Sequence, residues 1–177
     1  MYTALALIRE ELKGAHDMLE SVVVDIKPED LQKDPGGKAF PLGSMYAHLI
    51  FSEDAIVNGM VQKKTPLFAG EWAAKTGASS PMPAMDADWS VNNEKWSKTV
   101  QIDLPALQAY AQAVYAATES YVATLTDEDM EKEIDLGDWG KKKLGLLLAG
   151  MVIGHTYSLT GEISAIKGVH GSKGYPF

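Results

Sequence analysis

The four histidines of the chain, which has no cysteine, determine what metal or acid–base chemistry it could perform. His48 and His155 each lie on an apolar stripe with helical spacing, so both side chains are expected to face the interior. Imidazole is a common ligand of Zn, Ni, Cu and Fe, and helical bundles assemble such sites from side chains on facing helices. The pair therefore predicts either a metal site or two hydrogen-bonded core histidines, and the residue pattern leaves both open.

Two positions that follow His155 are expected to point into the same space. At 100° per residue, Leu159 is displaced from His155 by about 40° and Glu162 by about 20°. A histidine at position 159 would form a strong ligand pair with His155, but the residue there is leucine. Glu162 is the nearest acidic substitute, with the alternative that it is a partly exposed carboxylate near the end of the bundle.

Two residues on the first half of the chain could line the same space. Ser52 lies one helical turn beyond His48. His16 is at the edge of an apolar stripe and comes level with His48 if the first two long helices are antiparallel; otherwise it lies at the surface boundary. We therefore treat His48 and His155 as candidate metal ligands, and the candidate pocket-lining residues are His16, Ser52, Leu159 and Glu162.

Four stretches with apolar residues at three- and four-residue steps must position these side chains. They predict long helices over about 3–24, 42–62, 103–125 and 143–167. Between the second and third helices, residues 64–98 lose this periodicity and contain several Pro and Gly, with a short helix predicted at 71–75. The pattern predicts one all-α domain over residues 1–177, a four-helix bundle with a long crossover between its second and third helices.

The amino-acid composition and charge disfavour some classes of binding partner. With 16 Lys and Arg against 24 Asp and Glu, the net charge is −8, which disfavours binding to nucleic-acid phosphates. The longest apolar run, over 144–154, is shorter than the ~20 residues that cross a bilayer. Neither a P-loop nor a Gly-x-Ser-x-Gly nucleophile motif occurs. We expect a cytoplasmic homodimer that acts on a small molecule and has no nucleic-acid or membrane partner.

Several segments, taken together in this order and spacing, resemble the DinB-like superfamily of helical bundles. This superfamily includes enzymes that depend on mycothiol or bacillithiol. The segments are IKPEDL at 26–31, FPLGSMYAHL at 40–49, EWAAKTG at 71–77, HTYSLTGEI at 155–163 and GVHGSKG at 168–174. The resemblance covers the whole length of the chain and implies the same bundle fold.

The resemblance also implies a set of metal ligands. The superfamily places one histidine on the second helix and a His-x-x-x-His pair on the fourth, and His48 and His155 match the first two of these positions. Leu159 occupies the third. A catalytic zinc site normally has three protein ligands and one open position, so a Zn or Ni ion would need Glu162, His16 or a carboxylate from elsewhere in the chain to complete the set.

Two functions remain as hypotheses at this stage. In the first, a divalent metal activates a water or a substrate thiol, which gives hydrolysis or thiol-linked transfer on a small molecule. In the second, the protein is a metal-free, non-catalytic bundle that binds a small ligand or dimerises, and the two histidines are hydrogen-bonded core residues.

Overall fold

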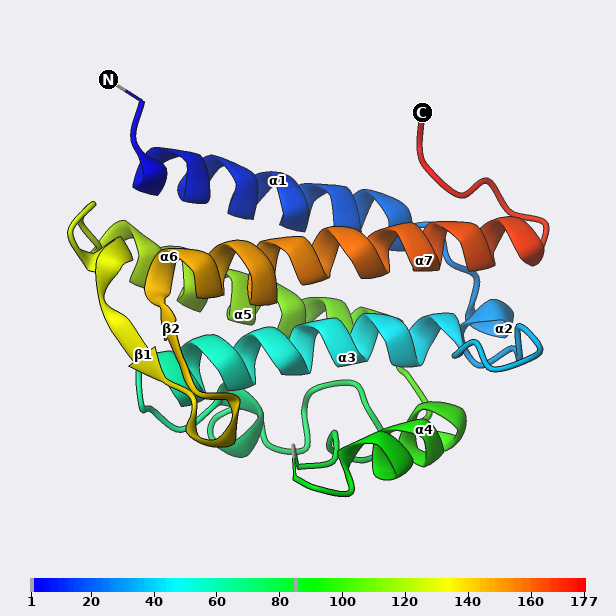
Figure 1. Ribbon diagram of the computed structural model, residues 1–177. Helices are drawn as coiled ribbons and strands as arrows, with labels where there is room; N and C mark the ends of the chain where they lie inside the picture. The colour runs from blue at the N-terminus through cyan, green and yellow to red at the C-terminus, as the bar shows by residue number, and fades with distance from the viewer. Residues whose placement is uncertain (1, 85) are drawn as a thin grey trace.

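The computed structural model describes residues 2–84 and 86–177. Its long helical segments run side by side (Figure 1): α1 (Ala4–Val23), α3 (Leu42–Asp54) continued by η1 (Ala55–Val61), α5 (Leu104–Ala123), and a rod made of α6 (Leu144–Leu147), η5 (Leu148–Gly154) and α7 (His155–Val169). Each long helix predicted from the sequence is found to within two residues at both ends. The all-α fold class is confirmed, but shorter helices and two π-helices, η1 and η5, make a plain four-helix description incomplete.

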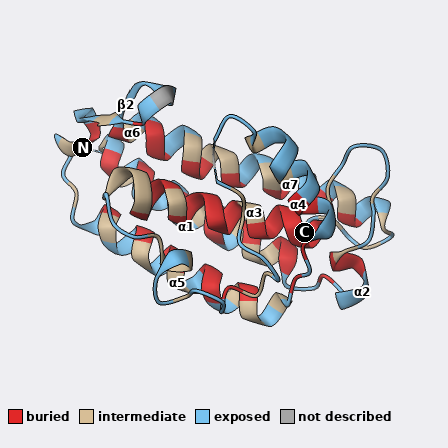
Figure 2. Cartoon of the chain, turned by 90° about the horizontal axis from the view of Figure 1, so that it is seen from below, coloured by how far each residue is buried: buried red, intermediate tan, exposed pale blue. Residues whose placement is uncertain are grey.

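The long helices pack in a closed ring around the core. Helix α1 contacts α7 and α5, and α3 contacts the same two neighbours on the other side. Buried residues concentrate on these helices in the middle of the molecule (Figure 2). The side chains of Thr3 and Asp103 cap the N-termini of α1 and α5, as expected for these residue types. The ring has four seams between neighbouring helices. Two of them, the α3–α7 seam and the α1–α5 seam, lie opposite each other.

The continuous rod of residues Leu144–Val169 passes a simple test for a membrane-spanning helix. It has 26 residues, and its most apolar window has a mean hydropathy of 1.3. The core helix of a helical bundle meets the same criteria, and this rod packs against both α1 and α3. Its hydropathy is therefore accounted for by the core that it helps to form.

The crossover after η1 is fastened to the bundle by one buried carboxylate. Asp54 accepts hydrogen bonds from the backbone N–H groups of Leu67 and Phe68, at 3.0 Å each, and from the Tyr110 hydroxyl at 2.7 Å. Leu67 and Phe68 belong to the 3-10 helix η2 (Leu67–Ala69). Asp54 thus joins α3, the crossover and α5, which explains why a long irregular segment lies flat against the bundle.

The crossover also contains a helix that the sequence did not predict. Helix α4 (Trp89–Thr99) is mostly polar, and only Trp96 and Ser97 are buried on it. Trp96 packs edge-on against Phe51 of α3, with ring centroids 6.3 Å apart. A helix of three turns with one buried aromatic residue has almost no hydrophobic periodicity, which is why the sequence did not indicate it. The short helix predicted at 71–75 is wrong, because these residues form turns and Ala74 has a positive φ of 60°.

Shorter elements close the ends of the bundle. The turn helix α2 (Pro28–Leu31) has its proline in the first turn, a position that proline favours. After the 3-10 helix η3 (Asp129–Glu131), β1 (Glu133–Asp135) and β2 (Lys141–Lys143) form an antiparallel hairpin. The tip of the hairpin is the 3-10 helix η4 (Gly137–Trp139). The hairpin leads directly into α6 (Figure 1). Its tip brings Trp139 to the α3–α7 seam.

Candidate functional site

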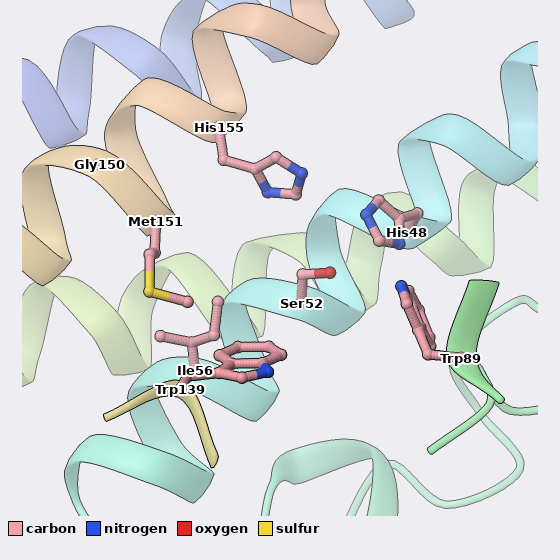
Figure 3. A pocket seen from close by; sticks show the side chains of 8 residues that line it. All are labelled: His48, Ser52, Ile56, Trp89, Trp139, Gly150, Met151 and His155. Carbon is pink, nitrogen blue, oxygen red and sulfur yellow. The ribbon is translucent and has the colours of Figure 1, made fainter. Parts of the chain in front are cut away.

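A cavity of about 320 Å³ lies at the α3–α7 seam. Its size is at the lower end of the range for small-molecule sites. Figure 3 shows its eight lining side chains, which come from α3, α4, η1, η5, the start of α7 and the hairpin tip. They are His48, Ser52, Ile56, Trp89, Trp139, Gly150, Met151 and His155.

Both π-helices of the described chain contribute to this cavity. η1 begins three residues after Ser52 and supplies Ile56, and η5 ends immediately before His155 and supplies Gly150 and Met151. A π-helix spaces its side chains differently from an α-helix, and such segments are rare and occur frequently at functional sites. Because two of them lie on facing helices around one cavity, the α3–α7 seam is the candidate functional site.

The structure brings the two predicted histidines together. Their side chains point toward each other across the seam (Figure 3), with ring centroids 5.3 Å apart and ring planes at 90°. Trp89 of α4 stands on the other side of His48, with ring centroids 5.8 Å apart. Among the described residues, Nδ1 of His48 is buried and has no hydrogen-bond partner.

Burial makes both imidazoles weak bases. It lowers the pKa of His48 to about 4, with a smaller contribution from the neighbouring His155. Burial also lowers the pKa of His155. Both rings are therefore neutral near pH 7, and each presents one donor and one acceptor nitrogen. Ser52 adds a hydroxyl from one turn further along α3.

The other predicted pocket residues lie elsewhere, apart from Ser52. Leu159 is half-buried and packs against the hydrophobic core, and Glu162 is exposed. Neither is among the residues that line the cavity. The expectation that both share the space of His155 is therefore wrong. The cavity opens along η5, N-terminal to His155, and the two residues lie on the C-terminal side.

His16 is also not part of this cavity, and it is not a surface-boundary residue. It is buried at the α1–α5 seam, where its Nε2 lies 3.0 Å from a carboxylate oxygen of Glu53 and its Nδ1 lies 3.3 Å from one of Glu119. The ring stacks on Tyr115 with centroids 3.9 Å apart. Burial acts to lower the pKa of His16, but the hydrogen bonds with Glu53 and Glu119 outweigh it and raise that pKa.

A metal ion of the kind implied by the histidine pair does not fit the residues present. Among the side chains that the structure describes, in residues 2–84, 86–137 and 139–177, no group of three or more His, Asp or Glu converges in a way that could hold a metal ion. The side chain one turn after His155 is the apolar Leu159, and the nearest acid on that helix face is exposed. The seam therefore offers two neutral imidazoles and lacks the third protein ligand of an open zinc site.

Some lining residues were outside the sequence prediction. Trp89 was missed because α4 was missed. Ile56 lies one turn after Ser52 on the same helix face, where helical spacing could have indicated it. The clustering of tryptophans in the connecting segments was the one available signal, since Trp89 and Trp139 both come from such segments.

Comparisons with known proteins agree with this architecture. No curated protein matches the chain in sequence. A solved structure described as the conserved protein of locus from Enterococcus faecalis superposes with a TM-score of 0.78 at 19% identity, covering 97% of this chain and 100% of that one. At that identity the likeness shows the fold alone. The family model of the DinB superfamily matches residues 11–158, a range that includes both cavity histidines. The chain therefore belongs to the DinB superfamily.

Proposed function

We propose that the α3–α7 cavity binds a small molecule without a metal ion, and that His48 and His155 bind it as neutral hydrogen-bonding groups. The observation that carries this proposal is the pair of facing imidazoles, 5.3 Å apart at their centroids, without a third metal ligand among the described residues. Metal-dependent hydrolysis or thiol-linked transfer, the other function expected from the sequence, needs that ligand. Homodimerisation and a cytoplasmic location stay predictions from the sequence.

The lining of the cavity supports ligand binding over a purely structural role. Most buried polar side-chain atoms are hydrogen-bonded to protein or water, because an unpaired buried polar atom is costly. Nδ1 of His48 is unpaired in the part of the chain that is described. The indole of Trp139 at the mouth of the cavity is 46% exposed, so a bound molecule would cover apolar surface there.

The test uses untagged protein prepared with and without EDTA, with 4-methylphenol as the probe. Binding is followed by NMR on ¹⁵N-labelled tryptophan indoles. We expect the signals of Trp89 and Trp139 to shift to the same extent in both preparations. The indoles of Trp72 and Trp96 serve as internal controls because they pack against Tyr110 and Phe51, away from the cavity.

Zinc titration tests the alternative, in which the cavity binds a metal ion. We expect elemental analysis to find well below one metal ion per chain, and calorimetry with ZnCl₂ to show weak binding. Tight zinc binding that is abolished in His48→Ala would overturn the proposal in favour of metal-dependent chemistry. Binding of the phenol only in the metal-loaded protein would have the same consequence.

A further inference from the structure

The cavity separates its polar groups from its apolar groups. His48, His155 and Ser52 lie together at one end, and the opposite end is formed by Ile56, Met151 and Trp139 (Figure 3). A molecule that fills both ends must have a polar group at one end and an apolar body at the other.

The lining offers nothing to balance a charged ligand. Among the described residues that line the cavity, none is Asp, Glu, Lys or Arg, and burial keeps the pKa of both histidines below their ordinary value. Burying an ion without a counter-charge is expensive, whereas a neutral polar group needs only a hydrogen-bond partner. The chemistry of the cavity therefore favours an uncharged molecule.

The hydrogen-bonding groups at the polar end determine which neutral group of a ligand can bind there. A neutral imidazole has one nitrogen that accepts a hydrogen bond and one that donates. A ligand hydroxyl can do both, so it can pair with an imidazole nitrogen that faces the cavity and still interact with the nearby Ser52 hydroxyl. An apolar ligand would make neither hydrogen bond and would cover these polar groups at a cost.

The apolar end favours a flat aromatic body. Trp139 presents an indole face at the mouth, and Met151 places a thioether in the wall. Indole faces stack on aromatic rings, and methionine sulfur makes favourable contacts with them. Ile56 closes this end with a branched aliphatic side chain.

We infer that the ligand class of this cavity is an uncharged aromatic molecule that carries a hydroxyl group, with the hydroxyl at the His48–His155 end and the ring against Trp139 and Met151. This inference rests on the proposed function, since it names the class of molecule that the same cavity binds.

Four probes with the same six-membered ring test the class. They are 4-methylphenol, toluene, 4-methylbenzoate and 4-methylbenzylammonium, each titrated into the full chain in the presence of EDTA while the four indole signals are followed. We expect 4-methylphenol to bind at least tenfold more tightly than either ion and severalfold more tightly than toluene. The ranking needs no substitution, so it is independent of whether any variant folds.

A substitution assigns the hydroxyl preference to its residue. His48→Leu keeps a similar volume and removes a buried polar group that has no partner among the described residues. We expect the variant to bind toluene and 4-methylphenol equally well. Trp72→Phe, which alters an aromatic residue packed on Tyr110 outside the cavity, should leave the ranking unchanged.

The possible failures are distinguishable. If either charged probe binds as tightly as 4-methylphenol, or toluene equals it in the wild type, the inferred ligand class is wrong while binding in the cavity stands. If no probe shifts Trp89 and Trp139, the proposed function itself is overturned and the inference with it.

Discussion

Replacing His16 should destabilise the protein far more than replacing a typical histidine. His16 is 3% exposed and connects three helices, because its two ring nitrogens face Glu53 of α3 and Glu119 of α5. A neutral imidazole has only one N–H, so two carboxylate partners require the protonated ring. In His16→Phe, the stacking on Tyr115 is kept, but the Glu53 carboxylate, 4% exposed, loses its only positively charged hydrogen-bond partner among the described residues.

The magnitude follows from the burial of His16 and of its partner Glu53, each with a side chain 4% exposed. Breaking a buried ion pair by removing one partner costs about 3–5 kcal/mol, whereas replacing both partners by apolar residues is often close to neutral. We therefore expect His16→Phe to lower the free energy of unfolding by about 3–5 kcal/mol, and His16→Phe/Glu53→Leu to recover most of that loss. Glu119→Gln should cost less than ~1 kcal/mol, because the Glu119 side chain is 49% exposed.

Urea unfolding followed by circular dichroism measures all of these variants. The pH dependence adds a second readout. Because the hydrogen bonds raise the pKa of His16 in the folded protein, the stability it contributes is complete below pH 6.5 and is lost as the pH rises through the folded value. Glu20, Glu53, Glu119 and Lys13 surround the ring, so the comparison is made as wild type minus His16→Phe. A cost below about 1 kcal/mol for His16→Phe, or a double variant less stable than the single one, would refute the reasoning.

Three other substitutions have definite expectations. His48→Leu should reduce the loss of stability between pH 6.5 and 4, because the pKa of folded His48 is lowered to about 4 and the buried ring must be neutral; an unchanged pH dependence over this range would contradict this. Leu159→His should leave zinc affinity within about threefold of the wild type in calorimetry, because residue 159 does not line the cavity between the two histidines; a gain of about 100-fold or more would show that position 159 completes a metal site. Gly77→Ala should lower the free energy of unfolding by about 2–4 kcal/mol, because Gly77 has φ +80° and a Cβ there would overlap the Leu107 backbone nitrogen. Gly137→Ala is the matched control, with φ +66° and open space, and should cost only about 1 kcal/mol in the same urea experiment.

The long helices were predictable because their sequence signals are local. Leu5, Ile8 and Leu12 repeat at helical spacing and are all buried on α1, and Asp103 caps α5 as its position suggests. Helix α4 had no such signal, since its position is set by Trp96 packing on Phe51. Tertiary contacts can hold a helix in place although its sequence is mostly polar and has no hydrophobic periodicity. Such contacts could not be predicted from the sequence.

The site was predictable only in part for two physical reasons. The facing of His48 and His155 depends on helix faces, which periodicity reports well. The walls of the cavity also include Trp89 of α4 and Trp139 of the hairpin tip, and neither segment has a hydrophobic periodicity that would predict its position. The partners of His16 come from positions 37 and 103 residues away along the chain, and no local pattern encodes such distances.

Two consecutive residues of α3 show how the fold keeps charge out of the cavity. Ser52 lines the neutral cavity at the α3–α7 seam, and Glu53, one residue and about 100° further round the helix, meets His16 toward the α1–α5 side. The buried carboxylate of Glu53 thus lies where protonated His16 compensates it. The cavity keeps two neutral imidazoles in a mostly apolar wall, and the leucine at position 159 adds no further polar group to it. A cavity of this kind favours neutral ligands, because an ionic ligand would need a counter-charge. The carboxylate of Glu53 does not provide one, because it points to the other side of α3.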